Sequence, residues 1–284
     1  MTVSSPTLCT PDQEKSCFAC CPPIRPPGYE HLPYANEIKR VLRENTASLR
    51  KGDRSVLPIT GYSCWALGYL AGGFKRIGCL LHPGQNEGED LRYRVDYGGK
   101  CARESCVEAD LFSRLDQEAG TFWIRLSEGL DSFAYSSRTL NPLFSILGWS
   151  TPVLNLVAMA EKERDLPTES ILETYAFFKT HLPARANAYL LKAVVDSDHL
   201  DLLKDERFRD RFEALSNRLS KQLSLETLNS STAPYVHSLP MDSDFLNFLR
   251  LSARVARATE EEAAWLKEFT DQELLLFRDE LHLF

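Results

Sequence analysis

After residue 106, apolar positions repeat with the three- to four-residue spacing of α-helices. Thr168 and Thr259 are followed by acidic residues, a combination typical of helix starts. The stretch 107–133 has the same spacing, but Gly120 and Gly129 argue against one straight helix. The other expected helices cover about 152–163, 168–181, 185–195, 199–222, 242–257 and 260–281.

The first 106 residues have a different pattern. Their apolar positions predict one helix at about 34–51, which Gly52 would end. Glycines interrupt 52–106 repeatedly, and only 91–97 alternates like a short strand. The run 21–28 contains four prolines and predicts extended chain, because proline lacks a backbone donor and restricts its neighbours. The sequence thus predicts a mainly α protein with a loop-rich module at 1–106 and a helical body at 107–284.

Composition and charge narrow the function classes. The net charge of −7 argues against a general nucleic-acid binder, which needs excess Lys and Arg against phosphates. No stretch of about 20 apolar residues is present, so we expect no membrane span. Residues 1–17 contain charges and no apolar core of a secretion signal. We therefore expect a cytoplasmic protein with reduced thiols.

Cysteine is confined to the first module. No cysteine follows residue 106, although most of the chain lies beyond it. Such a distribution indicates that the first module uses sulfur. The eight cysteines are Cys9, Cys17, Cys20, Cys21, Cys64, Cys79, Cys101 and Cys106.

The spacing of these cysteines points to a metal. Cys17 and Cys20 are separated by two residues, which lets two thiolates reach one ion from a tight turn. Cys21 follows directly, so Cys20 and Cys21 either share an ion through a special turn or serve two metals or a multi-iron cluster. We expect the separate groups to converge in one small region. The candidate ligands are Cys17, Cys20, Cys21, Cys64, Cys79, Cys101 and Cys106, and the candidate cofactors are zinc and an iron–sulfur cluster.

The order of these motifs resembles a known family. The successive elements are Cys17-x2-Cys20-Cys21, Cys64-x2-Leu67, Gly78-Cys79-x2-His82-Pro83 and Cys101-x-Arg103-x2-Cys106. This order is similar to that of the zinc- or iron-chelating CxxCxxCC family, over roughly 17–106. The resemblance implies a metal-binding, loop-rich cysteine module packed on a multi-helix body. Some members of that family are described as flagellin lysine methylases, which implies group transfer as one activity.

Other interpretations of the polar residues stay open. The cysteines would also suit disulfide stapling or unconnected buried thiols, and Cys9 lies in a polar tail outside the ligand set. His82 is either a nitrogen ligand beside Cys79 or a polar loop residue. Arg103 either hydrogen-bonds to a thiolate or is solvated. We expect His31 at the surface.

Aromatic residues are expected in the core. For the last helix the acidic residues are expected outside and four apolar residues inside: Trp265, Phe269, Leu274 and Phe277. Four further aromatic residues are also expected to be buried: Phe122, Trp123, Phe133 and Trp149.

Three functions fit these features. The leading hypothesis is a metal-binding protein that holds zinc or an iron–sulfur cluster. The second is a redox or group-transfer enzyme, which needs an open coordination position or a substrate cleft. The third is an interaction protein whose helical body binds a protein partner while the metal is structural. The residues alone do not decide whether the chain catalyses a reaction.

Overall fold

The computed structural model describes residues 6–21, 29–49, 55–60, 63–70, 73–103, 105–162, 168–226 and 233–282. The chain forms two compact units, an N-terminal unit at Met1–Phe144 and a C-terminal unit at Ser145–Phe284. The sequence analysis places the boundary at 106/107, whereas the structure includes 107–144 in the first unit. Residues 22–28 of the Pro-rich run expected to be extended at 21–28, and the helix end expected at Gly52, lie outside the described residues.

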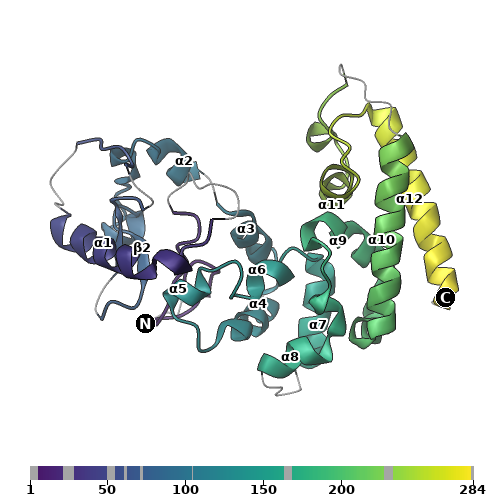
Figure 1. Ribbon diagram of the computed structural model, residues 1–284, viewed down its shortest axis with the longest axis horizontal. Helices are drawn as coiled ribbons and strands as arrows, with labels where there is room; N and C mark the ends of the chain where they lie inside the picture. The colour runs from purple at the N-terminus through teal and green to yellow at the C-terminus, as the bar shows by residue number, and fades with distance from the viewer. Residues whose placement is uncertain are drawn as a thin grey trace. The chain divides into compact units, whose positions relative to one another are not determined.

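Short helices dominate the N-terminal unit (Figure 1). Its α-helices are α1 (Ala35–Ser48), α2 (Gly98–Arg103), α3 (Val107–Ser113), α4 (Gln117–Ile124) and α5 (Ser132–Tyr135), and α6 (Leu143–Ile146) spans the unit boundary. Its 3-10 turns are η1 (Leu32–Tyr34), η2 (Pro83–Gln85), η3 (Arg92–Arg94) and η4 (Arg125–Ser127). The sheet of the described residues consists of two antiparallel strands, β1 (Leu67–Tyr69) and β2 (Ile77–Cys79).

The strand expected at 91–97 is wrong. That segment instead forms the 3-10 turn η3, and only Val95 makes an isolated bridge, to Leu57. Leu91, Arg94 and Val95 are buried there, whereas Tyr93 and Tyr97 are exposed, so the buried positions do not alternate as in a strand. Two apolar three-residue strands, too short to show a pattern, form the hairpin instead.

The core of the N-terminal unit forms between α1 and this hairpin. Ile38 and Leu42 of α1 are buried, as the helical spacing predicts, and the helix side chains also bond to the strand. Thr46 Oγ1 accepts from Tyr69 N at 2.8 Å, and Asn45 Nδ2 donates to Leu67 O at 2.8 Å. The first helix therefore fixes the position of β1 both by apolar contact and by hydrogen bonds.

The helices expected at 107–133 form as separate pieces. Gly129 has a φ of +78°, a left-handed conformation that glycine adopts without strain, and it separates η4 from α5. The aromatic residues expected in the core are buried, with Phe122, Trp123 and Phe133 at 7%, 0% and 5% exposure.

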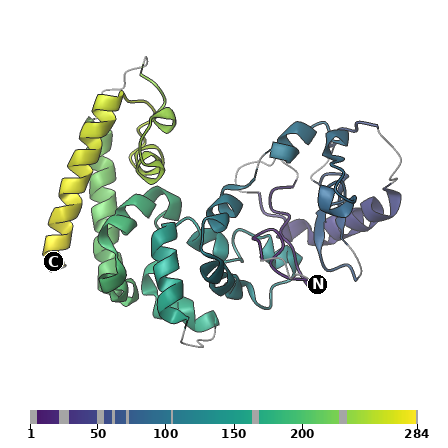
Figure 2. The same cartoon turned by 180° about the vertical axis from the view of Figure 1, so that it is seen from behind.

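The C-terminal unit is helical, as its apolar spacing predicts (Figure 2). Its α-helices are α7 (Thr151–Glu161), α8 (Thr168–Thr174), α9 (Ala184–Val194), α10 (Glu206–Glu226), α11 (Ser243–Asn247) and α12 (Glu260–Glu280). The remaining turns are η5 (Ala176–Lys179), η6 (Ser197–Lys204), η7 (Val236–Ser238) and the π-helical turn η8 (Phe248–Ser252). Within the described residues, no helix is both long and apolar enough to cross a bilayer.

Three of the expected helices in this unit end early or are divided. The helix expected at 168–181 ends with α8 at Thr174, because Tyr175, with φ −97° and ψ 76°, leaves the helical conformation before η5. The helix expected at 242–257 ends at the π-helical turn, because Arg254 adopts a left-handed φ of +62°. The helix expected at 199–222 is divided, because Asp205 is extended between η6 and α10.

Aromatic packing and a helix cap stabilise the C-terminal unit. Trp149, Phe177 and Phe212 form a buried cluster, with ring centroids 4.9 and 5.1 Å apart around Phe177. Long helices α10 and α12 lie side by side (Figures 1 and 2) and are joined by Arg218 Nη2–Glu273 Oε2 at 3.1 Å.

The predicted start of α12 at Thr259 is confirmed. Thr259 Oγ1 accepts from Glu262 N, and Glu262 Oε2 accepts from Thr259 N, which completes a capping box. The inward orientation expected for Trp265 is wrong, since this residue is 50% exposed and stacks on Phe269. The buried stripe of α12 runs instead through Ala263, Leu266, Thr270, Leu274 and Phe277.

Candidate metal centre

All eight cysteines lie in the described part of the N-terminal unit, and all are free thiols. The structure therefore contains no disulfide between these cysteines. Cys64 is buried, Cys9 and Cys20 are exposed, and the half-buried residues are Cys17, Cys21, Cys79, Cys101 and Cys106.

The segment that carries Cys17 to Cys21 is held by serines from distant parts of the chain. Ser16 N donates to Ser132 Oγ at 3.1 Å, and Phe18 N donates to Ser136 Oγ at 2.9 Å. Ser16 Oγ also exchanges two hydrogen bonds of 2.7 Å with the backbone of Ile77. The cysteine segment is thus fixed on one side to the hairpin and on the other to α5.

The turn itself brings backbone donors to sulfur. Cys21 N donates to Phe18 O at 2.9 Å and closes the turn, while Ala19 N donates to Cys17 Sγ at 3.5 Å. An N–H group directed at sulfur stabilises the thiolate over the thiol.

A second group of cysteines lies at the apolar core. Cys64 is a member of the core cluster, and Cys21 and Cys79 pack against it. Cys79 pairs with Leu67 in the hairpin register, and Leu67 N donates to Cys64 O at 3.0 Å. Asn45 Nδ2 also donates to Cys64 O at 3.1 Å. The hairpin and α1 therefore bring Cys64 and Cys79 to one end of the core.

Cys101 reaches this region because of one glycine. A Cβ on Gly98 would lie 2.2 Å from Arg92 O, so only glycine allows α2 to approach η3 this closely. The approach lets Arg92 Nη1 donate to Cys101 O at 2.8 Å, while Arg92 Nη2 pairs with Asp90 Oδ2 at 2.8 Å. An arginine is thereby held beside Cys101.

Cys106 caps α3 with its sulfur. Cys106 Sγ accepts from Ala109 N at 3.3 Å, in the position that Ser or Asp oxygen usually fills. Glu108 in the first turn forms an ion pair with Arg138, including an Arg138 Nη2–Glu108 Oε2 contact of 3.1 Å.

Cys9 lies with these residues and is not an isolated tail. Cys17 N donates to Cys9 O at 2.9 Å, and Tyr135 OH donates to Leu8 O at 2.8 Å. A surface cavity is lined by Cys9 together with Ala109 of α3. Sequence analysis left Cys9 out because its neighbours along the chain are polar. The one apolar neighbour, Leu8, was the signal in the sequence that this segment packs against the unit, and Leu8 is buried in the structure.

The thiols influence one another electrostatically in two sets. Burial raises the pKa of the Cys17 thiol to about 12, and the neighbouring sulfurs of Cys20, Cys9 and Cys106 add to this rise. The hydrogen bond from Ala19 N opposes it. Burial, with Cys20 and Cys9 among its neighbours, likewise raises the pKa of Cys106 to about 11. Partial burial and Cys20 raise the pKa of Cys9.

The second set surrounds Cys64. A hydrogen bond with Cys20, burial and the sulfurs of Cys79 and Cys64 raise the pKa of Cys21 well above its ordinary value. Burial, with Cys79 and Cys101 as sulfur neighbours, raises the pKa of Cys64 to about 12. The pKa values of Cys79 and Cys101 are also raised, chiefly by burial, while Arg92 opposes the rise at both.

These thiols are neighbours but are not in coordination geometry. Among the described residues, no three His, Cys, Asp or Glu side chains are already arranged to hold one metal ion. Sulfurs that share a zinc ion lie about 3.8 Å apart, as a Zn–S bond of about 2.3 Å requires. The donor set nevertheless fits zinc or an iron–sulfur cluster, because both are bound by thiolates on loops and element ends.

The polar residues considered beside the cysteines have other contacts. His82 Nδ1 accepts from Gly84 N at 3.1 Å and caps η2. Burial, followed by Arg92, lowers the pKa of His82. Arg103 Nε donates to Gly99 O at 2.9 Å within its own helix.

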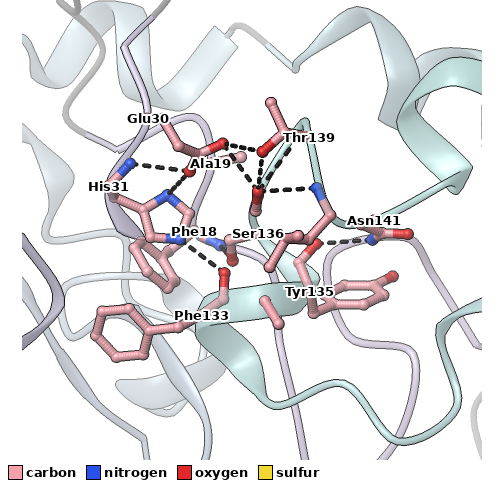
Figure 3. A network of polar contacts seen from close by, with 12 residues as sticks. Phe18, Ala19, Glu30, His31, Phe133, Tyr135, Ser136, Thr139 and Asn141 are labelled. Carbon is pink, nitrogen blue, oxygen red and sulfur yellow. Dashed lines mark hydrogen bonds and ion pairs between the residues drawn. The ribbon is translucent and has the colours of Figure 1, made fainter. Parts of the chain in front are cut away.

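His31 is buried, so the surface position expected for it is wrong. It is 2% exposed, its Nε2 lies 2.7 Å from Phe133 O, and its Nδ1 lies 3.1 Å from Glu30 Oε1 (Figure 3). The Phe18 ring packs against His31 at 4.7 Å between ring centroids. Glu30 Oε2 accepts from Ser137 Oγ at 2.8 Å. His31 therefore supports the cysteine segment through its contact with Phe18. The sequence could not predict this burial, because His31 lies in a short loop without a repeating apolar pattern.

Comparisons with known proteins give no further guidance. No family description, curated protein or solved structure matches this chain.

Proposed function

We propose that this chain is a metal-binding protein whose N-terminal unit holds zinc or an iron–sulfur cluster through its cysteines. The observation that carries the proposal is the gathering of free thiols from separate segments: Cys21 and Cys79 pack against the core cluster that contains Cys64, and Cys17 N donates to Cys9 O at 2.9 Å. A cation in their midst would offset the desolvation that raises the thiol pKa values, since thiolates are the form that binds metal.

Backbone donors support this assignment. N–H groups of Ala19, Ala66 and Ala109 donate to Cys17, Cys64 and Cys106, with N–S distances of 3.3 to 3.5 Å. Such donors orient a ligating sulfur and tune the centre that it binds. Three separate segments share this local geometry.

The metal would also organise the surrounding chain. The segment 52–106 has many glycines, and its described residues contain only short strands and helical turns, so its ordering entropy must be offset locally. A structural zinc site contributes an apparent free energy of about 10–16 kcal/mol at neutral pH, which is enough for this purpose. The CxxCxxCC resemblance favours the same class of site.

The direct test is metal analysis of protein purified without oxygen. The expected result is stoichiometric zinc in a colourless protein, or iron with acid-labile sulfide in a brown one. Protein that holds neither, even after reconstitution with zinc or with iron and sulfide, would refute the proposal.

A double variant tests the structural role. Cys20→Ser with Cys79→Ser should lose metal and become protease-sensitive within 52–106, while the C-terminal unit stays folded. The matched control is Ser63→Ala, which removes a half-buried hydroxyl beside Cys64 that has no hydrogen-bond partner among the described residues. If the double variant loses metal but 52–106 stays protected from protease, the metal does not stabilise the fold. An enzymatic role for the site then becomes the favoured hypothesis.

A further inference from the structure

We propose that the eight cysteines form two separate metal centres with four thiolates each, an inference that rests on the proposed function. The first centre is formed by Cys9, Cys17, Cys20 and Cys106. The second centre is formed by Cys21, Cys64, Cys79 and Cys101.

The count of ligands fits two centres. A structural zinc site takes four ligands, and a typical iron–sulfur cluster is held by four cysteines. One centre would therefore leave four of the eight thiols without a role. All eight lie in the same unit, and no cysteine occurs elsewhere in the chain.

The second set is assembled at the apolar core. Cys64 belongs to the core cluster, and Cys21 and Cys79 pack against that cluster. Cys101 lies on α2, whose close approach to η3 depends on Gly98, and its sulfur is an electrostatic neighbour of Cys64 and Cys79.

The first set is assembled around the segment that precedes the cysteine turn. The backbone bond between Cys17 N and Cys9 O pairs two of its members, and Cys106 caps α3 through Ala109 N. Cys9 and Ala109 line one surface cavity, so the N-terminal segment lies against the start of α3.

The adjacent pair Cys20–Cys21 divides the sets. The thiols of these two residues are hydrogen-bonded to each other, so the proposed division runs between adjacent sulfurs. Here Cys21 packs on the core, whereas Cys20 is exposed and is a neighbour of Cys9, Cys17 and Cys106. Cys20 also neighbours Cys21 and Cys101, but the second set already has four thiols without it.

Each set has its own arginine. Arg138 lies close to Cys106 and Cys17 and pairs with Glu108. Arg92 lies close to Cys79 and Cys101 and pairs with Asp90. A centre of four thiolates around a divalent ion carries two net negative charges, so a separate cation beside each set suits two centres.

Metal content in paired variants tests the division. We expect Cys9→Ser with Cys106→Ser to reduce metal per chain to about half that of the wild type, and Cys21→Ser with Cys101→Ser to do the same. The four-site combination should hold none. Ser113→Ala on the exposed face of α3 is the control and should keep the full content.

Cobalt titration of the metal-free wild-type chain gives a measurement that needs no variant. Thiolate-to-cobalt absorption should saturate at two equivalents per chain, and saturation at one would overturn the inference. Complete loss of metal in either double variant, or full retention in either, would also overturn it while leaving the proposed function intact. A wild-type chain that binds no metal at all is the separate failure of the proposed function.

Discussion

Ser132→Ala tests how firmly the structure holds the cysteine segment. Ser132 is 2% exposed, and its Oγ accepts from Ser16 N at 3.1 Å while donating to Lys75 O at 2.6 Å. Ser16 is itself 1% exposed, so its N–H group would lose its partner without gaining water.

The expected magnitude follows from that lost partner. A buried donor left unsatisfied costs about 1–3 kcal/mol. Lys75 is exposed, so water can replace the hydroxyl at its carbonyl and adds little to the cost. Since about 1.4 kcal/mol corresponds to a factor of ten, local opening around Ser16 should become roughly 5- to 150-fold more frequent.

The assay is hydrogen exchange at single-amide resolution in the N-terminal unit. The amides of Ser16 and Phe18 should exchange faster in Ser132→Ala by the factor given above, while those of α12 should not change. Ser136→Ala should act similarly through Phe18 N. The control Ser113→Ala removes an exposed hydroxyl bonded to Asp110 O and should leave these amides unchanged. Unaltered exchange at Ser16 in the Ser132 variant would refute the view that these serines fix the segment.

Three further predictions concern stability and pH. Thr259→Ala should lower the stability of the C-terminal unit by about 0.5–2 kcal/mol in urea unfolding, because the capping box is lost; no change would mean that the cap is redundant. Burial acts to raise the pKa of Glu30, but hydrogen bonds from Ser137, His31 and Thr139 together lower it, so its contribution is present at neutral pH and lost as pH falls. Glu30→Gln should therefore destabilise the N-terminal unit by about 1.5–3 kcal/mol at pH 7, and the difference from the wild type should shrink only as pH falls through the lowered pKa of Glu30, below the ordinary value for glutamate. Because burial raises the pKa of the thiols, metal must displace protons, and competition with a chelator should show weaker metal binding at lower pH; an affinity independent of pH would contradict this.

Local patterns predicted the helical elements well. The starts and ends of α7, α9 and α12 lie close to the expected ranges, because each helix buries one apolar stripe. The mistaken orientation of Trp265 shows the limit of that argument. Its position lies beside the stripe through Ala263 and Leu266, and an aromatic residue there stacks on Phe269 at the surface.

The parts of the candidate site that sequence could not predict depend on distant residues. Ser16 meets Ser132 and Ile77, which no periodicity connects, and His31 is buried by Phe133 across a separation of 102 residues. The spacing of the cysteines predicted which residues to consider, but it gave no sign of the role of Cys9. The place of Cys9 beside the other cysteines depends on a backbone hydrogen bond from Cys17 N to Cys9 O.

The bonds from Ser16 to Ser132 and from Phe18 to Ser136 join residues 116 and 118 positions apart. During synthesis, therefore, the cysteine segment emerges long before its serine partners exist. At roughly 5–20 residues per second, the ribosome needs about 6 to 24 s to travel from Ser16 to Ser136. Throughout that interval the first four thiols are on a nascent chain that lacks its partners in α5, open to oxidants and to chaperones. Assembly of the proposed metal site would accordingly be a late step, and its yield would depend on how well those thiols are kept reduced until α5 has been synthesised.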